Sequence, residues 1–196
     1  MTNSHIQKNK AFTLIELMVA TSLFTIIMLM GIGSLIVSSD SAKAAQKLRI
    51  AVDNVNFAME SMTRELRTGT YFYCGGVMSP DYNNFNGDCP SGVPSDIITF
   101  IPQVLPGSPS RVGYYREVRS NSSTHTLRRC ENSSSNCSDI VSSNVDVQSL
   151  KFFVKGSNIT DKIQPSVQIQ MSGIVKIKNT EIPFTLQSMA SQRSSE

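Results

Sequence analysis

The longest pattern in the chain is an apolar run that ends at Val37. Residues 17–37 contain no aspartate, glutamate, lysine, arginine or histidine. As a helix, this run is about 31 Å long, which is close to the thickness of the hydrocarbon core of a bilayer. The run therefore predicts a membrane-spanning helix, which we place at residues 12–37.

Beyond residue 37, apolar positions recur at alternating intervals of four and three residues. These positions are Leu48, Val52, Val55, Met59, Met62 and Leu66. Such intervals place one apolar stripe along a helix, and Gly69 is a typical stop signal. We expect residues 38–69 to continue the first helix, giving roughly fifty helical residues, and to pack their stripe on a sheet. A dimeric coiled coil is the alternative, for which this stretch is short.

The rest of the chain, residues 70–196, predicts a β-rich domain. Residues 70–93 are rich in glycine, proline and asparagine and are expected to form a surface loop. Strands are then expected over residues 97–101, 112–118, 124–129, 145–154, 167–171, 175–177 and 182–186, with a phase slip near Ser149. In the last third of the chain, one apolar face per strand predicts an antiparallel sheet covered on one side by the helix, which is an α+β fold.

The composition fits one modest domain joined to a membrane helix. The chain has 196 residues, 40% of them hydrophobic, and a net charge of +3. This charge is small and dispersed, so no nucleic-acid partner is expected. The residues beyond the apolar run suffice for a single core.

All four cysteines follow the apolar run, and none forms a Cys-x-x-Cys pair. A zinc or thioredoxin-like site is therefore not expected, whereas two disulfides in an extracytoplasmic compartment fit well. Of the three possible pairings, the local one is favoured, Cys74 with Cys89 and Cys130 with Cys137. Free thiols in a reducing compartment are the alternative and require the opposite topology. Lysines flank the run on both sides, so the positive-inside rule alone does not decide the orientation.

One carboxylate, Glu16, stands at the start of the apolar run. An acidic group costs about 2.5–3.5 kcal/mol at the centre of a spanning helix and less near the interface. Such a group either reaches water at the interface or pairs with a cation. The second possibility makes Glu16 a functional candidate.

The run Lys10-Ala11-Phe12-Thr13-Leu14-Ile15-Glu16 resembles the processing site of type IV prepilins and type II secretion pseudopilins. In that family a prepilin peptidase removes a short basic leader before a phenylalanine, whose new amine is then methylated. The resemblance implies a leader over residues 1–11 and cleavage between Ala11 and Phe12. The family usually has glycine before the cut, so alanine at this position implies slower cleavage.

The same resemblance implies a cationic partner for Glu16, the free N-terminal amine of a neighbouring subunit. It places the leader in the cytoplasm, the helix in the inner membrane and residues 70–196 outside the cytoplasm, in a periplasmic or surface filament. The implied partners are the prepilin peptidase, other pilin or pseudopilin subunits and an inner-membrane assembly platform. Weaker cues resemble the J-type, PilW-like minor pseudopilins: Tyr114-Tyr115, Leu127-Arg128-Arg129, residues 147–154, Gln164-Pro165 and Ser191-Gln192-Arg193.

Two other interpretations remain open. A secretory signal peptide would be cut at Ala42-Lys43-Ala44, although its apolar core should be shorter than this run. A single-pass anchor for a binding domain that never polymerises is the second. Gly31 and Gly33, within the apolar run, either weaken the helix or allow close packing between helices.

The sequence contains no recognisable catalytic, cofactor or metal motif. His5 lies in the leader, and His125 lies in a Ser/Thr-rich turn where a solvated side chain is expected. The oxygen-bearing residues of the loop lack the spacing of a calcium loop; they are Asp81, Asn83, Asn86 and Asp88. We therefore expect a substrate of a processing enzyme, without catalytic activity or a cofactor of its own.

Overall fold

The computed structural model describes residues 12–75, 87–89, 92–102, 111–120, 122–133, 135–158, 162–177 and 180–193. In this part of the chain, one helix, α1, is followed by strands β1 to β8. The chain forms two compact units, Met1–Gln46 and Lys47–Glu196, and each is considered by itself below.

Helix α1 spans Leu14–Thr68, so the apolar run and the amphipathic stretch form one helix as predicted. The helix continues through Gly31 and Gly33. Gly69 follows its last turn and donates its N–H to the carbonyl of Leu66 at 3.3 Å. A Cβ on Gly69 would lie 2.6 Å from the ring of Phe100, so a larger residue fits here only if that ring moves.

The buried face of α1 differs from the predicted stripe near its beginning. Its later members are buried as predicted: Val55, Met59, Met62 and Leu66. Val52 is 41% exposed, so its assignment to the stripe was wrong, and Ala51 and Ala58 are buried instead. Alanine contributes little to an apolar pattern, but its small side chain allows the helix backbone to lie close to the sheets.

Five strands form the first sheet, in the order β1-β2-β3-β4-β5, with antiparallel neighbours. They are Thr70–Cys74 (β1), Ile97–Ile101 (β2), Val112–Val118 (β3), His125–Glu131 (β4) and Cys137–Asp139 (β5). Strands β2, β3 and β4 match the predicted runs. Strands β1 and β5 lie where loops were predicted, because backbone pairing defines them and their side chains show no long alternation.

Three strands form a second sheet, in the order β6-β7-β8, also antiparallel. They are Val145–Lys155 (β6), Ser166–Ile177 (β7) and Thr180–Ser191 (β8). The register shifts between Val147 and Ser149, as the phase slip predicted. The antiparallel sheet predicted for the last third of the chain is confirmed. The separate sheet of the earlier strands was not predicted, since alternation shows which face of a strand is buried but not which strands pair.

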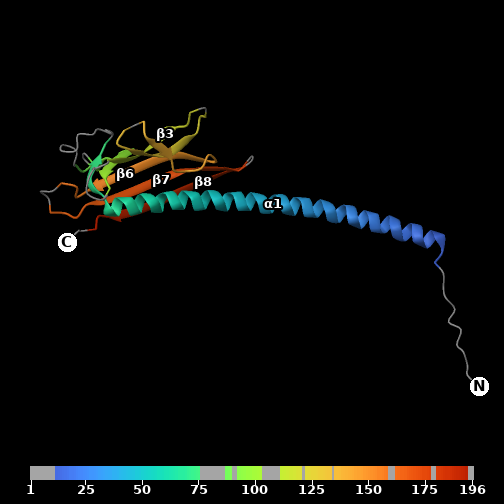
Figure 1. Cartoon of the computed structure of the whole chain (residues 1–196). Coiled ribbons are helices and arrows are strands. Elements are labelled where there is room, and N and C mark those ends of the chain that lie inside the picture. Colours follow the sequence, from blue (N-terminus) through green and yellow to red (C-terminus); the bar gives the residue numbers. More distant parts are fainter. Residues whose placement is uncertain are drawn as a thin grey trace, which may run out of the picture. The chain divides into compact units, whose positions relative to one another are not determined.

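The later part of α1 contacts both sheets, which confirms the α+β arrangement. Oγ1 of Thr63 lies 3.1 Å from Oγ of Ser188 on β8, and Glu65 accepts a hydrogen bond from Tyr114 on β3. Figure 1 shows this part of α1 running beside β8. The largest fully buried side chains include Phe72, Phe100, Phe152, Ile98, Leu127, Leu150 and Ile169.

Replacing Gly173 with alanine is expected to destabilise the sheet domain. A Cβ at this position, in the middle of β7, would collide with the carbonyl oxygen of Asp146 and lie 2.9 Å from the ring of Phe184. Overpacking of this kind costs about 1–3 kcal/mol. The unfolding midpoint of the detergent-solubilised chain should fall in Gly173→Ala but not in Ser172→Ala, and equal midpoints would contradict this explanation.

Candidate functional site

The beginning of α1 is fixed by Thr13 and Glu16. The backbone N–H of Glu16 donates to Oγ1 of Thr13 at 3.4 Å, and the helix begins at Leu14. Threonine followed three residues later by glutamate is the pattern of a capping box, which satisfies N–H groups that have no partner within the helix. A carboxylate in the first turn also interacts favourably with the helix dipole. Glu16 thus has a local role that the sequence analysis missed, although the Thr-x-x-Glu pattern was readable.

The predicted processing site lies directly before this cap. Phe12 is 79% exposed, and it precedes Glu16 by four residues. The side chain of Glu16 is exposed as well. Ala11 lies outside the described residues, so cleavage between Ala11 and Phe12 stays a prediction.

The first part of α1 presents a continuous apolar surface. Every residue from 12 to 43 is exposed, including Leu14 at 79%, Leu29 at 71% and Met30 at 72%. By length and composition, α1 can cross a membrane. An exposed apolar surface of this size is stable in lipid or against other apolar helices, and not in water.

In the second unit, Glu65 connects α1 to the first sheet. The hydroxyl of Tyr114 donates to its Oε2 at 2.8 Å, and Nε of Arg129 donates to both carboxylate oxygens at 3.1 Å. Arg129 also donates to Glu131 at 2.5 Å. Burial alone lowers the pKa of Arg129, but the hydrogen bonds to Glu131 and Glu65 raise it above its usual value, so its charge is permanent. We call Glu65, Tyr114 and Arg129 the helix–sheet clamp.

The clamp predicts a stability loss at high pH. Burial, and then the charge of Glu65, raise the pKa of Tyr114 well above its ordinary value of 10.0. A raised folded-state pKa means that this contribution is complete below pH 10.0 and is lost as the pH rises further. We expect Tyr114→Phe to flatten the fall of the unfolding midpoint between about pH 9 and about pH 11, whereas the exposed-residue control Tyr71→Phe leaves it unchanged. Identical pH profiles for wild type and Tyr114→Phe would contradict the assignment.

The first disulfide joins Cys74, at the end of β1, to Cys89, which is the local pairing favoured from the sequence. Cys89 is held against β6, because its N–H donates to the carbonyl of Val154 and its sulfur accepts from the N–H of Val154. Asp88 accepts hydrogen bonds from the N–H groups of Gly156 and Ser157 at 3.1 and 2.7 Å. This disulfide therefore connects an edge of the first sheet to the end of β6.

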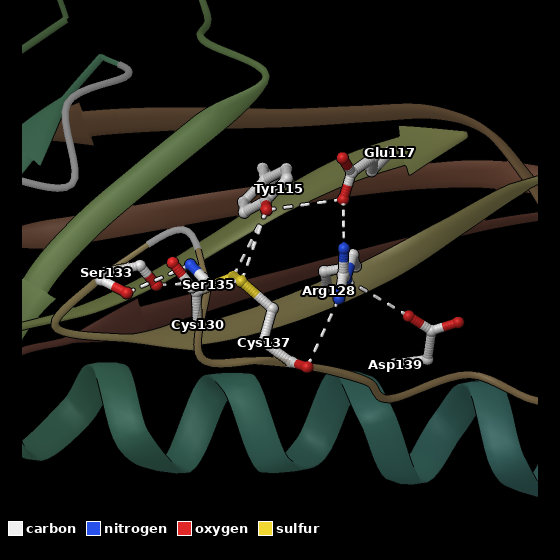
Figure 2. The surroundings of a disulfide bond; sticks show 8 residues. All are labelled: Tyr115, Glu117, Arg128, Cys130, Ser133, Ser135, Cys137 and Asp139. Carbon is white, nitrogen blue, oxygen red and sulfur yellow. Dashed lines mark hydrogen bonds and ion pairs between the residues drawn. A yellow bond between two sulfur atoms is a disulfide. The ribbon is translucent and has the colours of Figure 1, made fainter. Parts of the chain in front are cut away.

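The second disulfide joins Cys130 and Cys137, which are directly paired across β4 and β5. The hydroxyl of Tyr115 lies 3.3 Å from Sγ of Cys130 and 3.5 Å from Sγ of Cys137, as Figure 2 shows. Nearby, Arg128 donates to Glu117 at 2.5 Å and lies 3.4 Å from Asp139. These contacts secure β5 to the sheet, and they assemble neither a nucleophile nor its base.

His125 lies within the strand predicted at residues 124–129 and not in the turn before it, where a solvated side chain was expected. It is the first residue of β4, its side chain is 31% exposed, and its Nδ1 lies 3.6 Å from Oδ1 of Asp146. The same oxygen accepts the N–H of His125 at 2.8 Å. Among the described residues, no three His, Cys, Asp or Glu side chains gather as metal ligands. Three of the candidate loop ligands lie outside the described part: Asp81, Asn83 and Asn86.

Comparison with known proteins identifies one segment of the chain. Residues 6–32 match the family model of the prokaryotic N-terminal methylation motif. This segment contains Ala11, Phe12 and Glu16. No curated protein and no solved structure matches the chain. The match supports a type IV pilin-like or pseudopilin protein, and this motif implies processing by a prepilin peptidase and assembly with other pilin subunits. With the long apolar helix, it fits a single-pass inner-membrane anchor.

Proposed function

We propose that this chain is a minor pilin or pseudopilin, a structural subunit of a type IV pilus or of a type II secretion pseudopilus. The observation that carries the proposal is the methylation motif at residues 6–32, located on an apolar helix with no described residue covering it. Prepilin peptidase cuts between Ala11 and Phe12. The protein acts by assembly and not by catalysis.

The energetics of assembly follow from the first part of α1. In the membrane, lipid covers its exposed apolar side chains, and extraction from lipid is unfavourable unless another apolar surface replaces it. The corresponding helices of neighbouring subunits provide that surface in a filament. Extraction is therefore offset by burial among neighbours, with an assembly platform in the inner membrane supplying the work.

Glu16 directs the docking of each new subunit. After cleavage, the amine of Phe12 carries a positive charge in an apolar environment, and Glu16 of a neighbour is a carboxylate at a similar depth. Both charges are costly to bury alone and tolerable as a pair. The pairing thus favours one register between adjacent helices.

The domain after the helix lies outside the cytoplasm. Two disulfides persist in oxidising compartments and are rare in the cytoplasm, and both bonds belong to the second unit. The leader is consequently cytoplasmic, where the family's peptidase cleaves. A low-abundance, J-type or PilW-like position in the filament is the finer form of this proposal.

A membrane-anchored binding domain that does not polymerise is the second candidate. The observation in its favour is the position of Glu16 in the first turn of α1, because the interaction of a carboxylate with the helix dipole explains Glu16 without a neighbour. The two candidates differ in where the mature chain is found.

The test is fractionation of cells that express the chain with the complete filament machinery. If the chain is a filament subunit, we expect to find it in sheared surface filaments or in periplasmic filaments. In a strain that lacks the assembly ATPase, the chain should remain entirely in the membrane. A non-polymerising anchor stays in the membrane in both strains, and that result would refute the proposal.

A further inference from the structure

Within the described part of the chain, the outer edge of β8 is a long open sheet edge. Strand β8 has 12 residues and lies at the end of the order β6-β7-β8. From Phe184 to Ser191 it contains no charge and no proline, and its register with β7 is continuous. Charges, prolines and bulges are the features that protect natural edge strands from further pairing. The second half of β8 lacks all three.

The other sheet edges differ from β8. Within the described residues, Gly87 exchanges backbone hydrogen bonds with β1, through Phe72 and Cys74. Ser95 does the same with Phe152 on β6. The remaining edge strand, β5, has three residues. Among the described strands, β1 and the second half of β6 are thus already paired and β5 is short, whereas β8 offers a long continuous edge for another strand.

The backbone groups that point outward from β8 can be identified from its proline. Pro183 has no N–H and fits an edge strand only where the N–H would face away from its neighbour. The backbone N–H and C=O groups of successive residues in a strand point in alternate directions. The groups that point away from β7 therefore also include those of Thr185, Gln187, Met189 and Ser191. Two backbone hydrogen bonds agree with this alternation. The N–H of Gln192 donates to the carbonyl of Pro165, next to β7, and the N–H of Arg193 donates in the opposite direction, to the carbonyl of Arg67 on α1.

Two adjoining hollows lie along this edge, between β8 and the end of α1. Their volumes are about 560 and 640 Å³, and both are lined by Arg64 and Arg67. Arg193 lines the second hollow and Glu60 the first. Glu60 is already paired with Arg64 at 2.9 Å, so the groove has an excess of positive charge. Met189 contributes a 60% exposed apolar side chain to the second hollow.

We propose that the groove between α1 and β8 binds an extended, acidic segment of a partner protein by strand addition. The partner's backbone pairs with the outward groups of Thr185 to Ser191, a length of about 20 Å. Its carboxylates pair with Arg64, Arg67 and Arg193. This site uses the last turns of α1 and not its apolar first part, so its failure would leave the proposed function untouched.

The probe is a fluorescent peptide of about eight residues in which glutamate alternates with valine, added to the full chain in nanodiscs. We expect saturable binding, and binding weaker by about tenfold or more for a peptide with lysine in place of glutamate. N-methylation of alternate peptide nitrogens should abolish binding, because it removes the ladder hydrogen bonds. Equal binding of the acidic and basic peptides would overturn the proposal, and so would equal binding of the N-methylated peptide.

Variants of the chain locate the site. Gln187→Pro removes one outward N–H without removing a bond to β7, and Arg64→Glu with Arg67→Glu reverses the charge of the groove. Both should weaken peptide binding by about tenfold or more, whereas Arg49→Glu, an exposed arginine earlier on α1, should not. A second copy of this chain is the competing occupant of the edge, and sedimentation of the wild type and of Gln187→Pro tests it. Self-association that depends on Gln187 would assign the edge to a second copy and overturn the proposal.

Discussion

Replacing Glu16 with glutamine is expected to remove this subunit from filaments while leaving its membrane insertion intact. Glutamine has the same shape, and the backbone N–H at this position can still donate to Oγ1 of Thr13, so the beginning of α1 at Leu14 is preserved. Only the charge is lost, and the amine of a neighbouring Phe12 then has no partner. Leaving a buried charge unpaired costs about 3 kcal/mol or more, which is roughly a hundredfold in the docking equilibrium. The amount of chain in sheared filaments should fall accordingly.

Asp40→Asn is the matched control for this experiment. Asp40 is an exposed carboxylate farther along the same helix, and its neutralisation should leave filament incorporation at the wild-type level. Glu16→Ala removes the side chain as well as its charge but keeps the N–H that donates to Thr13, so comparing it with glutamine separates the loss of charge from the loss of the side chain. Wild-type incorporation of Glu16→Gln would show that docking does not depend on the charge of Glu16.

Replacing Glu65 with alanine is expected to give the largest loss of stability in the sheet domain. Tyr114 is fully buried, and its hydroxyl would lose the acceptor that lies 2.8 Å away. Arg129, whose side chain is 24% exposed, would keep only Glu131 as a carboxylate partner. An unsatisfied buried hydroxyl and a weakened ion pair together predict that the free energy of unfolding falls by about 2–4 kcal/mol. Denaturant unfolding of the full chain in micelles, monitored by near-ultraviolet circular dichroism, measures this loss.

Glu60→Ala provides the comparison within the same helix. Glu60 pairs with Arg64 at 2.9 Å, but the side chains are 69% and 77% exposed. Exposed pairs of this spacing contribute about 0.3–0.5 kcal/mol. If the two alanine variants were equally stable, the clamp would not hold the helix on the sheet.

The sequence predicted those elements whose side chains repeat with a clear period. The alternation from Val145 to Val154 located β6, and the interruption near Ser149 located its register shift. The apolar run predicted the first part of α1, and Gly69 predicted where the helix ends. Both disulfides followed the local pairing because few residues separate their cysteines.

Features set by distant partners were not readable. The division into two sheets depends on which strands exchange hydrogen bonds, and β1 depends on pairing with β2 alone. Glu65 was overlooked because nothing local distinguishes it from Glu60, although one carboxylate meets Tyr114 and Arg129 and the other faces solvent. The helix cap at Thr13 could be predicted from its spacing to Glu16, but Glu16 was interpreted only as a charge at the start of a membrane helix.

The cut between Ala11 and Phe12 is the central claim, and intact-mass analysis of the N-terminus tests it most directly. The membrane-extracted chain should begin at N-methylated Phe12 when prepilin peptidase is present and retain its leader when the peptidase is absent. A chain that begins near Ala45 in both cases would identify an ordinary secreted protein. A chain that keeps Met1 or Thr2 with active peptidase present would identify a plain anchor, and either result would contradict the account.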